Sequence, residues 1–294
     1  MSLLGVDIGG TKIRSTVFDD QLQPVESVEA PTALLRRGTP AFAHDLVGFL
    51  ESQRVRDHAM LGLVLNGVLD QGRVPYSSLM GGSVDFPLQE YLADRLGMPV
   101  KVDDDIHAMG LAEYHLGLGR GSRSLAMLNI GTGIGVAHVQ GGHVLRGSFA
   151  AGLISEQLIW VDELAEWRSL DRSVCGRGLT DMYQTLTGEH VQAASVMARS
   201  QAGDGDAIRT LRAFTTAFSW VLALVSRFYH PEVISINGSV AKSWKLFGPS
   251  ALTQYRQELE TVFWAHAIKV STLQYPAEKG ILYDLTQSKD ERSA

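Results

Sequence analysis

The sequence predicts an α/β protein of two domains, and two observations carry this expectation. Short apolar runs typical of buried strands alternate with longer segments in which apolar residues recur at helical spacing. A glycine-rich turn follows an apolar strand twice, once in each half of the chain, at Gly9-Gly10 and at Gly131-Thr132-Gly133. The chain has 294 residues, which is enough for one large or two medium domains.

The composition is that of an ordinary globular protein, with 45% hydrophobic residues, 20% charged residues and a net charge of −6. This charge does not indicate a protein that binds nucleic acid or a membrane surface. No apolar run approaches the roughly 20 residues that cross a bilayer. The N-terminus lacks a basic region followed by an apolar segment, so we expect a cytoplasmic protein. The single cysteine, Cys175, excludes an internal disulfide.

The first glycine turn has the features of an anion site. The apolar run from Leu3 to Val6 ends at Asp7, Gly9-Gly10-Thr11-Lys12 follows, and the alternation of apolar and polar residues resumes at Ile13. This order predicts a hairpin whose glycines adopt backbone conformations that other residues resist. Its N–H groups, together with Thr11 and Lys12, would bind a phosphate. Asp7 is placed to hold a hydrated Mg²⁺. For the Gly-Gly pair alone, an ordinary hairpin with a surface lysine explains the pattern equally well.

The order of strand, aspartate, Gly-Gly-Thr and lysine resembles the first phosphate loop of the actin-like, hexokinase-type ATPases. It is most similar to the ROK family of bacterial sugar kinases and sugar-responsive repressors, and the resemblance covers nearly the whole chain. It implies two actin-like (ribonuclease H-like) domains with a central cleft, over residues 1–117 and 118–275. The C-terminal helix, predicted at about residues 276–294, is expected to join the first domain.

The resemblance implies ATP and Mg²⁺ as cofactors. Gly9, Gly10, Thr11 and Lys12 of the first domain, with Gly131, Thr132 and Gly133 of the second, would hold the phosphates, and Asp7 would hold Mg²⁺ through water. Gly238, in the turn after Ile236, matches the adenosine-site turn of the family. Where the family has a double glycine, this chain has Asn237-Gly238.

Three consecutive aspartates, Asp103 to Asp105, precede a predicted helix that runs through Glu113. Counting back from Glu113 places Asp105 on the catalytic aspartate of the family and Asp104 on its sugar-binding asparagine. At the start of a helix, the dipole would keep Asp105 ionised, so that it accepts the proton of the acceptor hydroxyl. Acidic capping of a helix without any catalysis is the alternative. We expect His107, in the same segment, to be a structural histidine.

The acceptor part of the resemblance is altered. After Ala150-Ala151-Gly152, Leu153 occupies the position of the glutamate that binds sugar in the family, and Glu156 occupies that of its histidine. Ser78 replaces an asparagine, and Asn66-Gly67 replaces a Pro-Gly pair. Sites that hydrogen-bond sugar hydroxyls discriminate sharply, so these changes predict a different acceptor.

Gly67, Ser78, Asp104 and Glu156 are therefore the predicted substrate-binding residues. The two extra carboxylates, Asp104 and Glu156, suggest an amino sugar or another cationic acceptor. The cysteine cluster that binds zinc in the family is missing, and one cysteine cannot replace it, so we predict no structural zinc.

Two further segments have predicted structures. Residues 74–82 are expected to be irregular because of their proline and glycines. Trp160, Trp167 and the charged residues between them are expected to form a helix over the active-site mouth, where a homodimer contact is possible.

The sequence thus predicts an ATP-dependent kinase that phosphorylates a hydroxyl of a hexose or hexose derivative. The resemblance favours the 6-hydroxyl, as in a glucokinase or an amino-sugar kinase. A catalytically silent ROK-type protein that binds sugar or nucleotide is the alternative, and polyphosphate is a possible donor in place of ATP. The first strand begins at Leu3, which leaves no room for the N-terminal helix-turn-helix of the repressors of the family, so we do not expect DNA binding.

Overall fold

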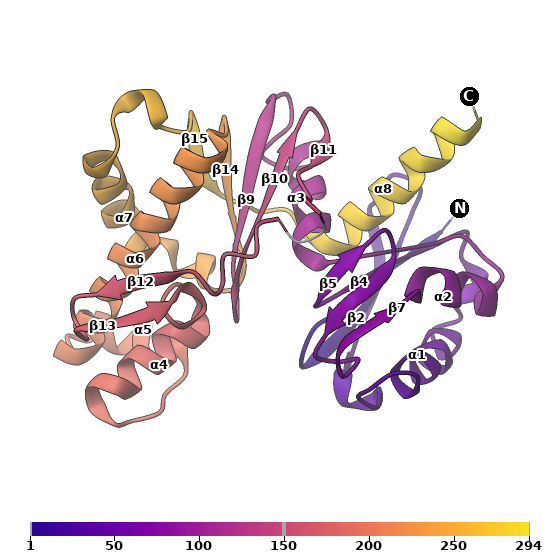
Figure 1. Cartoon of the computed structure of the whole chain (residues 1–294), viewed down its shortest axis with the longest axis horizontal. Coiled ribbons are helices and arrows are strands. Elements are labelled where there is room, and N and C mark those ends of the chain that lie inside the picture. The colour runs from indigo at the N-terminus through magenta and orange to yellow at the C-terminus, as the bar shows by residue number, and fades with distance from the viewer. Residues whose placement is uncertain (1, 149–150, 294) are drawn as a thin grey trace. The chain divides into compact units, whose positions relative to one another are not determined.

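The computed structural model describes residues 2–148 and 151–293, and the backbone alone from residue 288 onward. Ala150, at the start of the predicted acceptor loop, lies outside the described residues. The chain forms two compact units (Figure 1). The first unit comprises Met1–Leu116, His143–Ala151 and Leu273–Ala294, and the second comprises Gly117–Gly142 and Gly152–Thr272. The domain limits taken from the sequence stay predictions, and they did not anticipate that His143–Ala151 lies with the first unit.

The first unit is built on a sheet with the strand order β3-β2-β1-β4-β8. β1 pairs antiparallel with β2 and parallel with β4, and Asp7 of β1 lies opposite Arg14 of β2. The elements of this unit are β1 (Leu3–Ile8), β2 (Lys12–Phe18), β3 (Pro24–Pro31), α1 (Ala41–Ser52), β4 (Leu61–Leu65), β5 (Val68–Asp70), β6 (Arg73–Ser77), β7 (Gly82–Phe86), α2 (Leu88–Leu96), β8 (Val100–Asp103), α3 (Asp105–His115), β11 (His143–Val144) and α8 (Pro276–Ser293).

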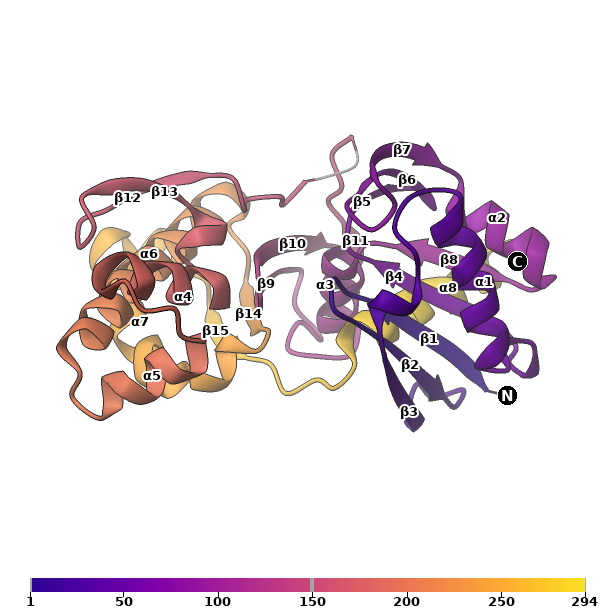
Figure 2. The same ribbon diagram turned by 90° about the horizontal axis from the view of Figure 1, so that it is seen from below.

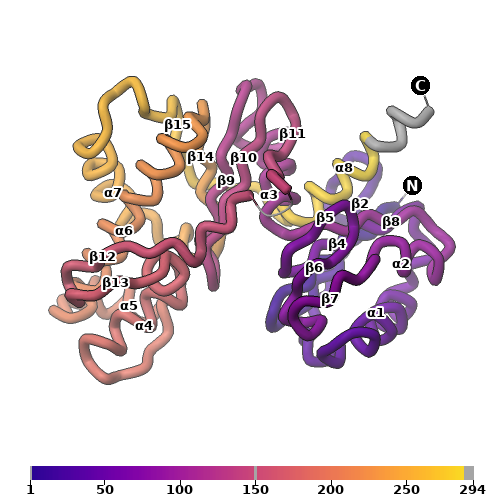
Figure 3. Tube along the Cα trace, in the orientation of Figure 1, coloured from indigo at the N-terminus to yellow at the C-terminus, as the bar shows by residue number. Residues whose placement is uncertain are grey.

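The two faces of this sheet are covered by different helices (Figure 2). Leu4, Val6 and Ile8 alternate along β1 and belong to a core that includes residues of α1 and α2. The opposite face carries glycines, because α8 packs closely there: a Cβ at Gly5 would lie 2.6 Å from Glu278 Cβ. Although α8 is the last helix in the sequence, it therefore lies against the first strand and against β4. In Figure 3 its yellow trace runs among the elements of the N-terminal unit.

The close packing of α8 determines which residues surround Asp7. Side chains two apart in a strand share a face, so Asp7 projects on the same face as Gly5, toward α8. α8 also packs against α3, where a Cβ at Gly280 would collide with the carbonyl oxygen of Ala108. The end of β1 and the beginning of α3 are thus held in one unit by the last helix.

The second unit contains β9, β10, β14 and β15, which follow the order β10-β9-β14-β15. β9 pairs antiparallel with β10 and parallel with β14, so the ends of β9 and β14 lie at the same edge. Its elements are β9 (Ser124–Ile130), β10 (Ile134–Gln140), β12 (Leu158–Val161), β13 (Glu166–Ser169), α4 (Gly176–Thr187), α5 (Ala193–Gln201), α6 (Gly205–Tyr229), β14 (Val233–Asn237), α7 (Trp244–Glu258) and β15 (Ala267–Val270).

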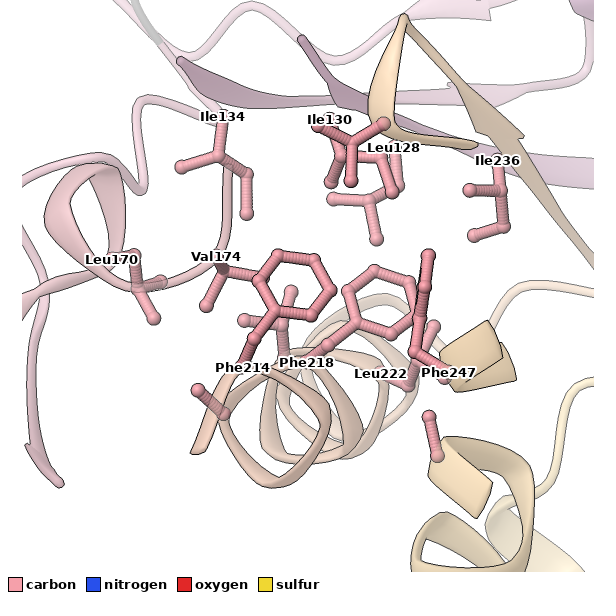
Figure 4. Close-up of a cluster of buried hydrophobic side chains, with 14 of the residues drawn as sticks. Leu128, Ile130, Ile134, Leu170, Val174, Phe214, Phe218, Leu222, Ile236 and Phe247 are labelled. Atoms are coloured by element: carbon pink, nitrogen blue, oxygen red, sulfur yellow. The ribbon is translucent and has the colours of Figure 1, made fainter. Parts of the chain in front are cut away.

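α6 is the central helix of the second unit. Phe214 and Phe218 point from α6 toward Leu128 of β9 and Ile236 of β14, and Phe247 of α7 packs edge-on against both phenylalanines (Figure 4). By length and composition alone, α6 resembles a membrane span. Because 61% of the apolar window is buried in the protein, a core helix explains the same pattern.

Two predicted elements require correction. The irregular structure predicted for residues 74–82 is limited to the turn at residues 78–81: the two ends of the segment belong to β6 and β7, which pair with each other, and β5 completes a three-stranded sheet. Trp160 and Trp167 do not lie on a helix. They are directly paired residues of the hairpin β12–β13, and their exposed rings meet edge to face at 5.9 Å. Of the charged residues between them, Asp162 and Glu163 lie in the turn of this hairpin, and Glu166 begins β13.

Candidate active site

The first glycine turn, between β1 and β2, is a short exposed loop. Gly9 donates its N–H to the carbonyl oxygen of Lys12 at 3.0 Å, while Gly10 and Thr11 are exposed. Thr32 braces the loop: its hydroxyl donates to the Gly9 carbonyl at 2.8 Å, and its N–H donates to the Thr11 carbonyl at 2.9 Å. No sequence signal pointed to Thr32, which follows β3 and meets the turn only in the folded sheet.

The reason given from the sequence for these two glycines is wrong. Neither Gly9 nor Gly10 has a positive φ. A Cβ at Gly9 would lie 3.4 Å from the Lys12 carbonyl oxygen, which is an ordinary contact, and a Cβ at Gly10 would meet no atom within 4 Å. The backbone could accept other residues here. What glycine provides at position 10 is open space next to the exposed N–H groups.

Lys12 extends from this turn and already has a partner. Its Nζ lies 2.5 Å from Glu29 Oε1 on the neighbouring strand β3, and both side chains are exposed. The hydrogen bond from Lys12 lowers the pKa of Glu29. A phosphate bound by Lys12 must therefore compete with Glu29, which is 17 positions away in the sequence and becomes a neighbour only through the pairing of β2 with β3.

Asp7 belongs to a charge network that links β1, β2 and α8. Arg14 Nη2 donates to Asp7 Oδ2 at 3.0 Å and to Glu278 Oε2 at 3.0 Å, and Arg14 Nε donates to Glu278 Oε1 at 2.5 Å. Burial, followed by the charge of Glu278, raises the pKa of Asp7 to about 6, although Arg14 opposes the shift. Arg14 and Glu278 were missed from the sequence, where 264 residues separate them.

The predicted catalytic residue, Asp105, is the first residue of α3. Asp104 caps this helix: its Oδ1 accepts the N–H of His107 at 2.7 Å, and its Oδ2 lies 2.5 Å from His107 Nδ1. Burial, followed by the charges of Asp104 and Asp7, raises the pKa of Asp105 to about 7. The expectation that the helix start keeps Asp105 readily ionised is therefore wrong, because these effects exceed that of the amide hydrogen bonds.

The remaining aspartate, Asp103, is buried and paired with an arginine. Arg146 donates to both of its oxygens, at 2.8 Å from Nη1 to Oδ1 and 2.5 Å from Nη2 to Oδ2. Ligand atoms of Asp103, Asp104 and His107 lie within 4.8 Å of one another, a combination that suits a metal ion. The Arg146 guanidinium, which is also 3.1 Å from His107 Nδ1, occupies the position of a cation in this cluster.

His107 has the structural environment that the sequence predicted. It is buried, and its Nε2 lies 3.3 Å from the carbonyl oxygen of Ala151. Burial, the largest single effect, would lower the pKa of His107, but the hydrogen bond with Asp104 and the charges of Asp104 and Asp103 together outweigh it, so the pKa is raised.

The predicted substrate-binding residues of the first unit differ in their exposure and in their contacts. Asp104 has both oxygens engaged by His107. Ser78 is exposed, whereas its neighbour Ser77 is buried and donates to the Asn66 carbonyl at 2.9 Å. A Cβ at Gly67 would lie 2.6 Å from the Tyr76 carbonyl oxygen, so glycine is required there for packing. A substrate role for these residues stays a prediction.

In the second unit, the structure brings Gly131, Thr132 and Gly133 next to the turn after β14. Gly238 has a φ of +95°, and a Cβ there would lie 2.5 Å from the Ile130 carbonyl oxygen. α4 begins at the same loop, because Gly176 donates its N–H to the Gly131 carbonyl at 2.8 Å. Unlike Gly9 and Gly10, Gly238 has a backbone conformation with positive φ that favours glycine.

A charged pair also lies at this second loop. A Cβ at Gly133 would lie 2.6 Å from Asp171 Oδ1, and Asp171 Oδ2 accepts from Arg177 Nη1 at 2.6 Å. The N–H of Asp171 donates to the Ser155 carbonyl at 2.9 Å. The side chains of Leu153 and Glu156, in the predicted acceptor loop, are exposed. Asp171 and Arg177 were missed because nothing in their sequence context marks them.

Comparison with known proteins identifies a family to which this sequence is similar over nearly its whole length. A model of the ROK family matches residues 3–282. N-acetylmannosamine kinase of Citrobacter koseri is 27% identical over 294 aligned residues, which cover 96% of this chain and 97% of the relative. Glucokinase of Streptomyces coelicolor is 31% identical over 150 residues, which cover 50% of this chain and 46% of the relative.

Solved structures show the same fold. ROK hexokinase from Thermus thermophilus has a TM-score of 0.80 and 27% identity, and the alignment covers 99% of this chain and 100% of that one. A ROK family glucokinase from Streptomyces griseus, in complex with glucose and AMPPNP, has a TM-score of 0.80 at 19% identity, over 98% of this chain and 100% of that one. The predicted α/β class with actin-like domains is confirmed. The chain belongs to the ROK family.

Proposed function

We propose that this chain, a sugar kinase, transfers the γ-phosphoryl group of ATP to a hydroxyl of a hexose or hexose derivative, with the 6-hydroxyl as the acceptor. The observation that carries the mechanism is the position of Asp105 at the start of α3, with a pKa raised to about 7. A general base is most effective when its pKa lies near the working pH. Asp7, beside the first glycine turn, contributes to this shift, which links the base to the phosphate loop.

In the proposed reaction, Asp105 accepts the proton of the sugar hydroxyl while the oxygen of that hydroxyl attacks the γ-phosphorus. The bond from this phosphorus to the bridging oxygen of ADP breaks, and the products are ADP and a sugar phosphate. Gly9, Gly10, Thr11 and Lys12 would hold the phosphates from the first unit. Gly131, Thr132 and Gly133 would hold them from the second, with Gly238 near the adenosine. The chain itself supplies orientation and the exclusion of water, which would otherwise accept the phosphoryl group.

The surroundings of Asp7 fit a hydrated Mg²⁺. Its carboxyl is flanked by Glu278 and contributes to the pKa shift of Asp105, so the site concentrates negative charge that Arg14 only partly offsets. Asp7 would hold the ion through water, as hard cations prefer oxygen ligands. When bound, Mg²⁺ supplies neutralisation of the phosphate charge.

We propose a neutral acceptor, either a hexose or an N-acylated hexosamine. The engagement of both Asp104 oxygens by His107 removes one of the two carboxylates on which the idea of a cationic acceptor rested. The other carboxylate, Glu156, is exposed. Leu153, a residue that is 58% exposed, cannot supply the hydrogen bonds of a glutamate to a sugar. The relative from Citrobacter koseri, named for N-acetylmannosamine, supports testing N-acetylated hexoses first.

We further propose that the protein acts in the cytoplasm as a homodimer, without a membrane or nucleic-acid partner. Its net charge of −6 supports the last two points.

The decisive experiment measures ADP release with ATP and Mg²⁺ over glucose, mannose, glucosamine, N-acetylglucosamine and N-acetylmannosamine, with Asp105→Ala as the control. Turnover of a neutral sugar that Asp105→Ala abolishes supports the proposal. Sugar binding in a thermal-shift assay without turnover by the wild type would instead support the catalytically silent alternative. Turnover with polyphosphate but not with ATP would overturn the proposed donor.

A further inference from the structure

We propose that Arg146 is a positioning residue that fastens the beginning of the acceptor loop to the head of the catalytic helix α3. This inference rests on the proposed function, which places the reacting hydroxyl next to Asp105. Arg146 belongs to the segment His143–Ala151, which lies with the first unit although its neighbours on both sides in the sequence lie with the second. Such a segment needs contacts that hold it in place.

The first contact is the two-fold hydrogen bond with Asp103. Arg146 donates from Nη1 and Nη2 to separate oxygens of this carboxylate, at 2.8 and 2.5 Å. The Asp103 side chain is 6% exposed, and the Arg146 side chain is 34% exposed. Paired geometry of this kind fixes the orientation of both groups, which a single point charge cannot do. Asp103 Oδ1 also accepts the N–H of Asp104 at 2.9 Å, so the pair reaches the residue next to Asp105.

The second contact passes through His107. Arg146 Nη1 lies 3.1 Å from His107 Nδ1, and His107 Nε2 lies 3.3 Å from the carbonyl oxygen of Ala151. Ala151 in turn donates its N–H to the carbonyl oxygen of Arg146 at 3.0 Å. Arg146 and Ala151 are therefore both attached to the first turn of α3. Gly152, the next residue, begins the segment that carries Leu153 and Glu156.

The charges explain why an arginine is needed at this place. Asp103, Asp104 and Asp105 are consecutive, and the first two are buried, so they repel one another strongly in a poorly solvated environment. Arg146 hydrogen-bonds the first of them, Asp103, and its charge also acts on Asp104. Its removal would leave Asp103 buried with its charge uncompensated, and the start of α3 would shift. A shift of about 1 Å at a reacting group is enough to lower a rate by about 100-fold.

The test compares Arg146→Ala, Arg146→Lys and the double variant Arg146→Ala/Asp103→Asn with the wild type. Arg123→Ala is the matched control, because Arg123 forms an exposed ion pair with Glu232 in the second unit, at 2.5 Å. For Arg146→Ala we expect kcat to fall about 10- to 100-fold and KM for the sugar to rise, while KM for ATP stays within about two-fold. Lysine should restore part of the activity, because it replaces the charge but not the paired geometry.

The double variant should lose no more activity than Arg146→Ala, since the amide that replaces the Asp103 carboxylate carries no buried charge. A folded Arg146→Ala enzyme with unchanged kcat and unchanged KM for the sugar overturns the inference. So does equal damage to KM for sugar and KM for ATP. Should Arg146→Ala not fold, Arg146→Lys decides alone: wild-type kinetics in this variant would contradict the proposed geometry.

Hydrogen exchange separates this inference from the proposed function, because it needs no turnover. In Arg146→Ala, the amides of His107 and Ala151 should exchange at least several-fold faster than in the wild type, and in Arg123→Ala they should not. Unchanged exchange at both amides refutes the inference whatever the activity. If the wild type phosphorylates no sugar but the exchange changes as expected, the proposed function fails while the attachment of the loop by Arg146 stands.

Discussion

Arg14 and Glu278 form a two-fold ion pair although 264 residues separate them in the sequence, with Nε–Oε1 at 2.5 Å and Nη2–Oε2 at 3.0 Å. Glu278 is fully buried, and Arg14 also binds Asp7. The pair therefore attaches the last helix to the strand hairpin that carries the first phosphate loop.

Glu278→Gln should destabilise the protein by about 1–3 kcal/mol, because a neutral amide cannot accept both charge-assisted hydrogen bonds from Arg14, which would keep Asp7 as its ionised partner. Urea unfolding of the two proteins measures this difference. Glu51→Gln is the matched control, since Glu51 pairs with Arg56 at 3.1 Å on the surface, where an ion pair contributes about 0–1 kcal/mol. Equal midpoints for Glu278→Gln and the wild type would contradict the structural role of this pair.

The activity should depend on pH through Asp105. Since its pKa is raised to about 7 and the base must be ionised, kcat/KM for the sugar should rise through pH 7 and level off above it. An aspartate with an unperturbed pKa would instead give a flat profile down to about pH 4. The pH profile of kcat/KM distinguishes the two. A profile that stays flat between pH 5 and 8 is incompatible with the proposed base.

Stability should show the opposite trend in the protein without ligands. The folded-state pKa values of Asp7 and Asp105, about 6 and about 7, lie above the ordinary value of 3.8, so the folded protein binds more protons than the unfolded chain in this range. The contribution of both groups to stability is therefore complete below pH 3.8 and is lost as the pH rises through 6 and 7. In Asp105→Asn, stability should therefore fall less steeply with rising pH than in the wild type. Thermal unfolding of both proteins from pH 4 to 8 measures this difference. An unchanged slope in the variant would count against the raised pKa of Asp105.

The glycines of the two turns should respond differently to alanine. Gly238→Ala combines a φ of +95° with a Cβ 2.5 Å from a backbone oxygen, so it should cost about 1–3 kcal/mol or more. Gly121→Ala is the control, because its φ is +81° but no atom lies within 4 Å of the added Cβ. The difference between the two variants in unfolding free energy isolates the collision. If both lose the same stability, the close approach at Gly238 has no energetic role.

Gly10→Ala tests the ligand instead of the fold. The added methyl meets nothing within 4 Å and the backbone has no strain there, so stability should stay within about 0.5 kcal/mol of the wild type. KM for ATP should nevertheless rise, because the methyl fills the space proposed for a phosphate. An unchanged KM for ATP would argue against phosphate binding at this turn.

Local patterns were sufficient to predict most of the fold. The strand, the tight turn and the resumed alternation around Gly9 identified the hairpin, and the spacing of Phe214, Phe218 and Leu222 identified α6. The Trp160–Trp167 segment was misread because a short hairpin with charges in its turn also places its aromatic residues several positions apart. Distinguishing the two needs the pairing of the strands, which is not a local property.

The candidate site was predictable where it consists of residues close in sequence. Asp105 and its capping neighbour Asp104 followed from one helix start. The partners of the acidic groups could not be predicted. Arg14 and Glu278 are 264 residues apart in the sequence, and Arg146 contacts Asp103 only because its segment lies with the first unit. The pKa of Asp105 was misjudged for the same reason, since burial and the charge of Asp7 arise only in the folded protein.

Removal of metals should separate structural from catalytic requirements. Cys175 is buried, and its Sγ donates to the Asp171 carbonyl at 2.8 Å, which is the environment of a packed thiol. Burial raises its pKa to about 11, which disfavours the thiolate that zinc binds. Dialysis against EDTA should therefore leave the melting temperature unchanged and abolish ATP-dependent turnover. Mg²⁺ alone should restore that turnover, both in the wild type and in Cys175→Ser, and added Zn²⁺ should have no effect on either protein. A fall in melting temperature on dialysis that Zn²⁺ reverses and Mg²⁺ does not would show a structural zinc site after all.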